Sequence, residues 1–276
     1  MDLSKTLTEV RQIVAEAGAK ILEIYSNPKR FETEHKADDS PLTAADLAAN
    51  KLIVSRLQEL TPEIPILSEE SAQAPWHERK HWDRCWVVDP LDGTKEFLKR
   101  NDEFTVNVAL VRNHQPILGV VYAPALQEWF YAARHEGAWH QTGKRVIERL
   151  TVSEKPADRA WRVVGSRSHS TPEVDAFVAR LGDAELVAMG SSLKLCLVAA
   201  GKADVYPRLG PTSEWDTCAA QAVVEEAGGQ VLNAETGEPL RYNARESILN
   251  PHFIVCAKAD PSWFGAARTR GGPSPR

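Results

Sequence analysis

Residues 86 to 97 read Trp-Val-Val-Asp-Pro-Leu-Asp-Gly-Thr-Lys-Glu-Phe, and this stretch decides the fold of the chain. Its apolar start predicts a buried strand, and Pro90 and Gly93 predict a turn directly after it. Asp89 and Asp92 then face one small space. Such carboxylates repel each other unless a proton, a hydrogen-bond network or a cation compensates, and hard divalent cations favour all-oxygen surroundings. The turn is therefore typical of half a metal site.

Composition limits the classes of protein to which the chain can belong. Its 276 residues are 43% hydrophobic and 26% charged, which is typical of a globular protein with a substantial core. The net charge of −5 argues against binding to a nucleic acid polymer. The four cysteines are widely spaced, which favours reduced, buried thiols. No segment has the pattern of a transmembrane helix or a signal peptide, so we expect a cytoplasmic protein, with a peripheral position at the inner membrane left open.

The residues before the central stretch predict two helices and a short strand. Helical spacing of apolar residues runs from Leu3 to about Asn27, and a polar loop then leads into a second helix at Thr43. Residues 64–67 read as a strand that ends at Ser68-Glu69-Glu70. The polar segment 75–84 is expected to be a mobile connection to the central strand.

The residues after the central stretch predict a meander and then an alternating half. Strand-like runs at 104–111, 116–122 and 129–133 favour an antiparallel meander, and the polar segment 142–156 reads as the crossing into a second half. From Trp161 onward, strands alternate with helices, which is typical of an α/β layer. Strands are expected at 161–164, 185–189, 203–206, 230–232 and 253–257, and helices at 172–181, 192–200 and 215–227. We therefore expect a layered α/β fold with an N-terminal half, 1–150, that carries the metal-binding turn, a C-terminal half, 151–267, that completes the site, and a disordered tail, 268–276.

Three further acidic positions have two interpretations each. Glu69 ends a strand, where acidic residues are usually solvated. Asp216 starts a helix, where the helix dipole alone favours an acid. Asp46 follows Thr43 at the position of a capping residue, which explains it fully without a catalytic role. The alternative for Glu69 and Asp216 is that they converge on the turn and complete a metal site.

Two segments are candidates for binding an anion. Gly190-Ser191-Ser192 precedes a helix that carries Lys194, so free backbone N–H groups, hydroxyls and an ammonium could gather there. The segment from Ser166 to His169 follows a strand and is the second candidate. Both segments are equally typical of ordinary polar loops, so the sequence leaves both interpretations open.

Several long motifs also resemble one family. Residues 89–94, Asp-Pro-Leu-Asp-Gly-Thr, together with 67–70, Leu-Ser-Glu-Glu, and 214–220, Glu-Trp-Asp-Thr-Cys-Ala-Ala, resemble the three signatures of the inositol monophosphatase superfamily. Segments 40–46, 95–107 and 190–212 are similar to its bacterial 3′(2′),5′-bisphosphate nucleotidase branch. The resemblance implies the alternating α-β-α-β-α sandwich of that superfamily.

The resemblance also implies roles for individual residues. The Mg²⁺ ligands would be Glu69, Asp89, the Leu91 carbonyl, Asp92 and Asp216, for two or three ions. The catalytic residues would be Asp46 and Thr94, which orient the attacking water, with Glu70 in support. Gly93 and Thr94 would meet the scissile phosphate, and Glu69, Leu91, Asp92 and Asp216 are also counted among the substrate contacts. The remaining nucleotide contacts implied are Ser166, His169, Gly190 and Lys194.

The activity implied is hydrolysis of the 3′-phosphate of adenosine 3′,5′-bisphosphate, a reaction that supports sulfur assimilation and is sensitive to lithium. The alternatives are an inositol monophosphatase or sugar bisphosphatase of the same fold, or a noncatalytic nucleotide sensor. The partner expected is a small nucleotide substrate, and a homo-oligomer is left open. The chain departs from the branch at Asp102, where glycine is commoner, and at Ala220-Gln221. These departures put substrate preference in doubt and leave the metal ligands intact.

Overall fold

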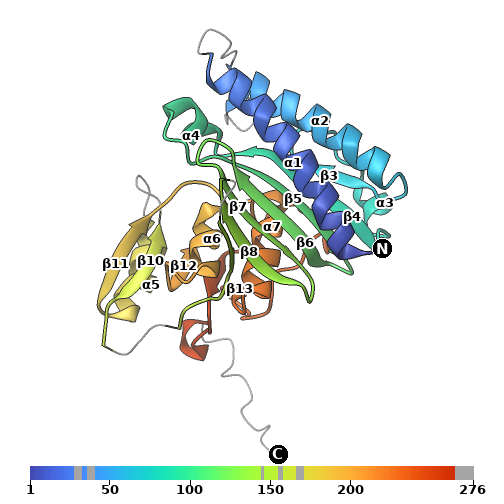
Figure 1. The fold of residues 1–276 in the computed structure, drawn as a ribbon. Helices are drawn as coiled ribbons and strands as arrows, with labels where there is room; N and C mark the ends of the chain where they lie inside the picture. Colours follow the sequence, from blue (N-terminus) through green and yellow to red (C-terminus); the bar gives the residue numbers. More distant parts are fainter. Residues whose placement is uncertain (28–32, 36–40, 144–145, 155–157, 166–170, 265–276) are drawn as a thin grey trace, which may run out of the picture.

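The computed structural model describes residues 1–27, 33–35, 41–143, 146–154, 158–165 and 171–264, and they form alternating layers of helices and sheets (Figure 1). The outer helices α1 and α2 cover one face of a seven-stranded sheet, and α6 and α7 lie between that sheet and a five-stranded sheet that α5 covers. The bounds are α1 Leu3–Tyr25, α2 Ala44–Leu60, α5 Pro172–Leu181, α6 Leu193–Ala199 and α7 Glu214–Glu226. The layers therefore follow the α-β-α-β-α order that was expected.

The seven-stranded sheet runs in the order β3-β4-β5-β6-β7-β8-β9. Only β3 and β4 are parallel among its pairs, and the remaining strands form the predicted antiparallel meander. The bounds are β3 Ile66–Ser68, β4 Arg84–Asp92, β5 Thr105–Arg112, β6 Gln115–Ala123, β7 Glu128–Ala133, β8 Gly137–Thr142 and β9 Val146–Arg149.

Strand β4 is buried on both faces, which explains its continuous apolar run. Trp86 and Val88 point into the core shared with α1 and α2, whereas Cys85 and Val87 point into the core shared with α6 and α7. A strand covered on both sides needs apolar residues at every position rather than at alternate ones. The acidic turn therefore leaves the end of a strand that both cores hold in place.

The five-stranded sheet has the order β11-β10-β12-β14-β13 and mixes parallel with antiparallel pairs. Its bounds are β10 Trp161–Gly165, β11 Ala184–Ala188, β12 Val205–Arg208, β13 Gln230–Asn233 and β14 Phe253–Cys256. Helix α7 packs directly against the larger sheet at Gly119 of β6. A Cβ atom there would lie 2.2 Å from the carbonyl oxygen of Ala219, so only glycine allows this approach.

Some short elements were not predicted. Strand β8 was not predicted, and neither was β9, which occupies the first part of the segment 142–156 by pairing with β8 before the chain passes on to β10 in the other sheet. The expected mobile connection 75–84 contains helix α3, Trp76–Arg79, and Arg79 is only 4% exposed. The other short elements are β1 Thr33–His35, β2 Pro41–Thr43, α4 Thr94–Lys99 and the 3₁₀ helix Pro261–Trp263.

Three further expectations concern the cysteines, membrane-spanning helices and the division of the chain. All four cysteines are buried and free, as expected. None of the helices in the described part of the chain is both long enough and apolar enough to cross a bilayer. The division at residue 150 stays a prediction, and the tail 268–276 lies outside the described residues.

Candidate active site

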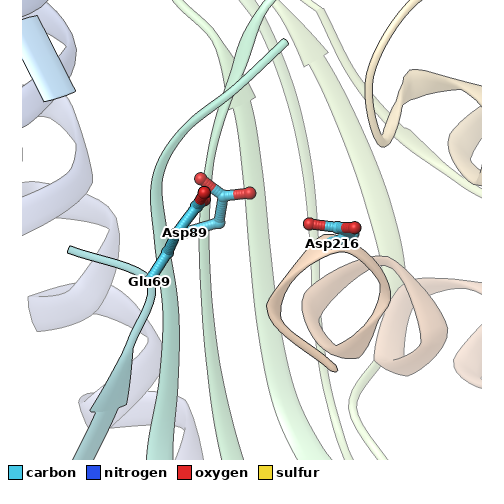
Figure 2. Close-up of side chains that lie close together, drawn as sticks. All are labelled: Glu69, Asp89 and Asp216. Atoms are coloured by element: carbon cyan, nitrogen blue, oxygen red, sulfur yellow. The ribbon is translucent and has the colours of Figure 1, made fainter. Parts of the chain in front are cut away.

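The parallel pairing of β3 and β4 brings two acidic residues to one edge of the sheet. Ser68 is the register partner of Val88, and the backbone N–H of Glu69 donates to the Val88 carbonyl at 3.2 Å. Glu69 and Asp89 therefore follow neighbouring strands in register. Asp216 approaches them from the first turn of α7, and one carboxylate oxygen of each residue lies within 4.8 Å of the others (Figure 2). Three acids from separate segments thus form one cluster, as the sequence predicted.

The turn itself is shaped by hydrogen bonds to its two aspartates. The Leu91 N–H donates to Asp89 Oδ1 at 3.1 Å, and the register with β5 shifts between Asp89 and Asp92. Asp92 Oδ2 accepts from the backbone N–H of Ser192 at 2.5 Å and lies 2.6 Å from its hydroxyl. The same hydroxyl lies 2.7 Å from the carbonyl oxygen of Asp216. Ser192 therefore joins the turn to α7, a role that the sequence did not indicate.

The protein balances the charge of the cluster only in part. Burial, followed by the charges of Glu69, Asp92, Asp216 and Asp46, raises the pKa of Asp89 well above its usual range. Burial and then the charge of Asp92 raise the pKa of Asp216 to about 7. Each shift means that the ionised form is costly where it lies, so the cluster favours a bound cation.

The donor set suits a hard divalent cation. Among the residues that the structure describes, the side chains of the cluster offer carboxylate oxygens, without sulfur or imidazole groups. Such a set is typical of Mg²⁺ or Ca²⁺ rather than of zinc or copper. Glu69, Asp89 and Asp216 would hold the ion, and the assignment of the Leu91 carbonyl and Asp92 as further ligands stays a prediction.

Asp46 fulfils its capping interpretation and also contacts the central turn, while its catalytic role stays a prediction. Its Oδ2 accepts from the Thr43 N–H at 2.9 Å and from the Thr43 hydroxyl at 2.5 Å, which completes a capping box at the start of α2. Its Oδ1 accepts from the Thr94 hydroxyl at 3.3 Å. Asp46 is 1% exposed, so one buried carboxylate both caps a helix and orients the threonine of the central turn.

Gly93 allows the turn to pass into α4. It is the N-cap of that helix at a φ of +90°, a conformation that residues other than glycine rarely adopt. Thr94 follows as the first residue of α4, beside the acidic turn.

Asn50 lies one helical turn after Asp46 and holds the loop that carries Glu69. Its Nδ2 donates to the Glu70 carbonyl at 2.9 Å, and its Oδ1 accepts from the Ser68 hydroxyl at 2.7 Å. The Asn50 amide therefore fixes the chain on both sides of Glu69. No sequence pattern singled out this residue, and the role of the Glu70 side chain stays a prediction.

Two backbone N–H groups at 190–192 that were expected to be free for an anion bind carboxylates of the protein instead. The Gly190 N–H donates to Glu103 Oε2 at 2.8 Å, and the Ser192 N–H donates to Asp92. These amides are therefore engaged by carboxylates rather than free for an anion. Lys194 does face the site, and burial lowers its pKa.

A small cavity of about 90 Å³ adjoins the acidic cluster. Asp92 and Asp216 line it on the acidic side, and Lys194 and Arg208 bring positive charge. Arg208 was not singled out from the sequence, although it lies in the segment 190–212 on which the resemblance rests.

A second cavity of about 460 Å³ shares Lys194, Tyr206 and Arg208 with the first. Its other lining residues are mostly apolar and include Val163, Val174, Val178, Leu186 and Leu209. The predicted contacts Ser166 and His169 lie outside the described residues. The arrangement is thus an acidic cluster, a pair of cations and an apolar cavity in succession.

Comparisons with known proteins give this arrangement a context. The model of the inositol monophosphatase family matches residues 2–263. The chain is 48% identical over 249 residues to the 3′(2′),5′-bisphosphate nucleotidase CysQ of Salmonella typhimurium, over 90% of this chain and 98% of that protein. It is 36% identical over 258 residues to the protein of the same name from Haemophilus influenzae, over 93% of this chain and 94% of that one. The crystal structure of CysQ from Bacteroides thetaiotaomicron matches with a TM-score of 0.81 at 45% identity, over 92% of this chain and 98% of the other. The expectation from the motifs is confirmed, and the chain belongs to the inositol monophosphatase family.

Proposed function

We propose that this protein is a Mg²⁺-dependent phosphatase that hydrolyses the 3′-phosphate of adenosine 3′,5′-bisphosphate to give AMP and phosphate. The observation that carries the proposal is the cluster of Glu69, Asp89 and Asp216 beside a cavity that Lys194 and Arg208 line. The 48% identity to a 3′(2′),5′-bisphosphate nucleotidase over 90% of the chain supports the choice of substrate. In a cell this reaction would recycle a by-product of sulfur assimilation.

The acidic cluster would hold the metal ions, and nearby residues would prepare the water. Bound Mg²⁺ would supply neutralisation of phosphoryl charge and activation of water. The Thr94 hydroxyl donates its proton to Asp46 Oδ1, so its oxygen is free to accept a hydrogen bond from the attacking water. Asp46 would then take up the proton that the water loses, through Thr94. The capping box holds the other oxygen of Asp46 and so fixes the direction of this path.

The substrate side favours a nucleotide with two phosphates over inositol monophosphate. A second phosphate needs positive charge of its own, and Lys194 and Arg208 line the small cavity together with Asp92 and Asp216. The apolar cavity of about 460 Å³ beyond them has room for a nucleoside. An inositol ring carries no second phosphate and no apolar base, so it would use neither feature.

The test compares kcat/KM for adenosine 3′,5′-bisphosphate, inositol 1-phosphate and fructose 1,6-bisphosphate, with and without Mg²⁺. We expect a strong preference for the nucleotide, dependence on Mg²⁺, and inhibition by lithium. Equal or better rates on the inositol or sugar phosphates would reject the nucleotide assignment. Binding of the nucleotide with no turnover at any Mg²⁺ concentration would support the noncatalytic sensor instead.

A further inference from the structure

Helix α3 lies in the chain between Glu69 and Asp89, and it carries a buried arginine. The Arg79 guanidinium lies 4.9 Å from the centre of the Trp76 ring. It donates to Asn243 Oδ1 at 2.9 Å, to the Arg245 carbonyl at 3.1 Å and to the Glu246 carbonyl. Asn243 Nδ2 returns a bond to the Arg79 carbonyl at 2.6 Å. Arg79 thus binds a segment that is far from it in sequence.

That segment, residues 242–250, is here called the strap, because it holds the first turn of α7. The Asn243 N–H donates to Glu214 Oε2 at 2.7 Å, and the Glu214 N–H donates to the Ile248 carbonyl at 2.9 Å. Asn250 Nδ2 donates to the Ser213 carbonyl at 2.7 Å. The strap therefore contacts the start of α7 at Ser213 and Glu214, three and two residues before Asp216.

The buried Glu214 carboxylate depends on the strap for a hydrogen bond. Glu214 is 0% exposed. Its Oε1 atom has no hydrogen-bond partner in the part of the chain that the structure describes. The bond from the Asn243 N–H is thus important for satisfying this buried group. If the strap moved, Glu214 would lose that bond, and the helix turn that carries Asp216 would have to adjust.

We propose that Arg79 is a positioning residue for the metal site, which acts by fixing the strap and thereby the place of Asp216 relative to Glu69 and Asp89. The inference rests on the proposed metal-binding role of that cluster. A guanidinium suits this task because its planar fork serves three acceptors at once, whereas a lysine ammonium would serve them with poorer geometry. Arg79 contacts neither metal nor substrate in this role.

The test measures Mn²⁺ binding directly, by electron paramagnetic resonance of the free ion, in the full-length protein. For Arg79→Met we expect about a tenfold loss of Mn²⁺ affinity, the lower end of what residues that orient metal ligands contribute. Arg79→Lys should restore little of it. Asn243 has a φ of +46°, so Asn243→Gly keeps the backbone and its N–H while removing the side chain that meets Arg79. It should weaken binding in the same direction.

The matched control is Arg162→Met. Arg162 is also an arginine with several hydrogen bonds inside the protein, but its side chain is 24% exposed and bonds to Asp204 and the Gly201 carbonyl. We expect this variant to melt at a lower temperature and to bind Mn²⁺ as the wild type does. Wild-type affinity in folded Arg79→Met, or in Asn243→Gly should the first variant fail to fold, would overturn the inference. Equal losses in the Arg79 and Arg162 variants would overturn it as well.

The outcome for the wild type separates this inference from the proposed function. If wild-type protein and Asp89→Asn bind Mn²⁺ equally, the acidic cluster is not the metal site and the proposed function loses its basis. If Asp89→Asn loses binding and Arg79→Met does not, the metal site stands and only the role of Arg79 is rejected.

Discussion

Asp89 and Asp204 are buried to nearly the same extent, at 1% and 2% exposure, yet the protein treats them in opposite ways. Asp89 faces other carboxylates, and its pKa is raised. Asp204 receives Arg159 at 2.5 and 2.7 Å and Arg162 at 2.9 Å, and although burial acts to raise its pKa, these arginines hold it well below its usual range. A buried acid is structural where the chain supplies the cations. Where burial and neighbouring carboxylates raise the pKa of the acid, its ionised form favours a bound cation.

The largest effect should come from neutralising one member of the acidic cluster. Asp216→Asn, and Asp92→Asn beside it, should lower kcat by roughly a thousandfold, because several kcal/mol of transition-state stabilisation depends on the bound metal. The fold should stay intact, since removing one of several like charges relieves repulsion. Circular dichroism and turnover of the bisphosphate nucleotide measure the two effects.

Asp204→Asn is the control for this prediction. It leaves two arginines without their carboxylate and should reduce the free energy of unfolding by about 3 kcal/mol, with kcat unchanged. Near-normal activity in both the Asp216 and Asp92 variants would mean that the cluster has been misassigned.

The second-largest effect should come from metal removal. It should lower stability through the acidic cluster that contains Asp89 and not through Asp204. Wild-type protein should gain stability from Mg²⁺, by about 2.7 kcal/mol at a hundred times the dissociation constant. Asp204→Asn should gain the same amount, whereas Asp89→Asn should gain little. Melting curves recorded with chelator and with Mg²⁺ test this, and a full Mg²⁺ response in Asp89→Asn would contradict it.

The pH dependence of the metal-free protein should have opposite signs in the two regions. Asp216 has a folded pKa of about 7, above its ordinary value near 3.9, so its contribution to stability is fully present below pH 4 and is lost as pH rises through 7. Lowering the pH from 8 to 6 in the presence of chelator should therefore raise the melting temperature. Asp204 has a lowered pKa, so its contribution is present above pH 4 and is lost on further acidification.

Mg²⁺ provides the control for the pH experiment. Since a bound cation needs ionised carboxylates, saturating Mg²⁺ should suppress or reverse the stabilisation between pH 8 and 6. Asp216→Asn should show a weaker pH response with chelator than the wild type does. An unchanged response in that variant would show that other groups titrate in this range.

Lys194 and Arg208 line the cavity beside the acidic cluster, and under the proposed function they would bind a phosphate of the substrate. Arg208→Ala and Lys194→Ala should each raise KM for adenosine 3′,5′-bisphosphate by about tenfold or more, since a hydrogen bond to a charged group contributes about 1.5–3 kcal/mol. The effect on kcat should be smaller. Steady-state kinetics decide this, and unchanged KM values would reject a phosphate role for both residues.

The sequence predicted the acidic cluster because its members end predicted elements. Glu69 and Asp89 follow two apolar runs, and Asp216 starts a helix, so each position was visible in the local pattern. The roles of Arg79, Asn50 and Ser192 were not predicted, because they lie in hydrogen bonds to segments that are distant in the sequence. Strand β9 was missed for a related reason, since only its pairing with β8 makes residues 146–149 a strand. Local periodicity predicts the secondary structure of a segment, whereas its tertiary hydrogen bonds determine which other segments it positions.

The smallest effect should come from a third aspartate, Asp102, which belongs to neither region. It has a φ of +69°, a conformation that glycine adopts more readily than aspartate, and its Oδ1 accepts from the Tyr25 hydroxyl at 2.7 Å. Burial and this bond raise the pKa of Tyr25 to about 12. Asp102→Gly would relieve the strain of a left-handed residue and lose the hydrogen bond, two effects of about 1 kcal/mol each with opposite signs. We therefore expect a change in the free energy of unfolding below about 1 kcal/mol and an unchanged kcat, measured by denaturant titration and turnover. A fall in kcat would show that the contact between Asp102 and Tyr25 holds the neighbouring helix α4, and with it Thr94, in its working position.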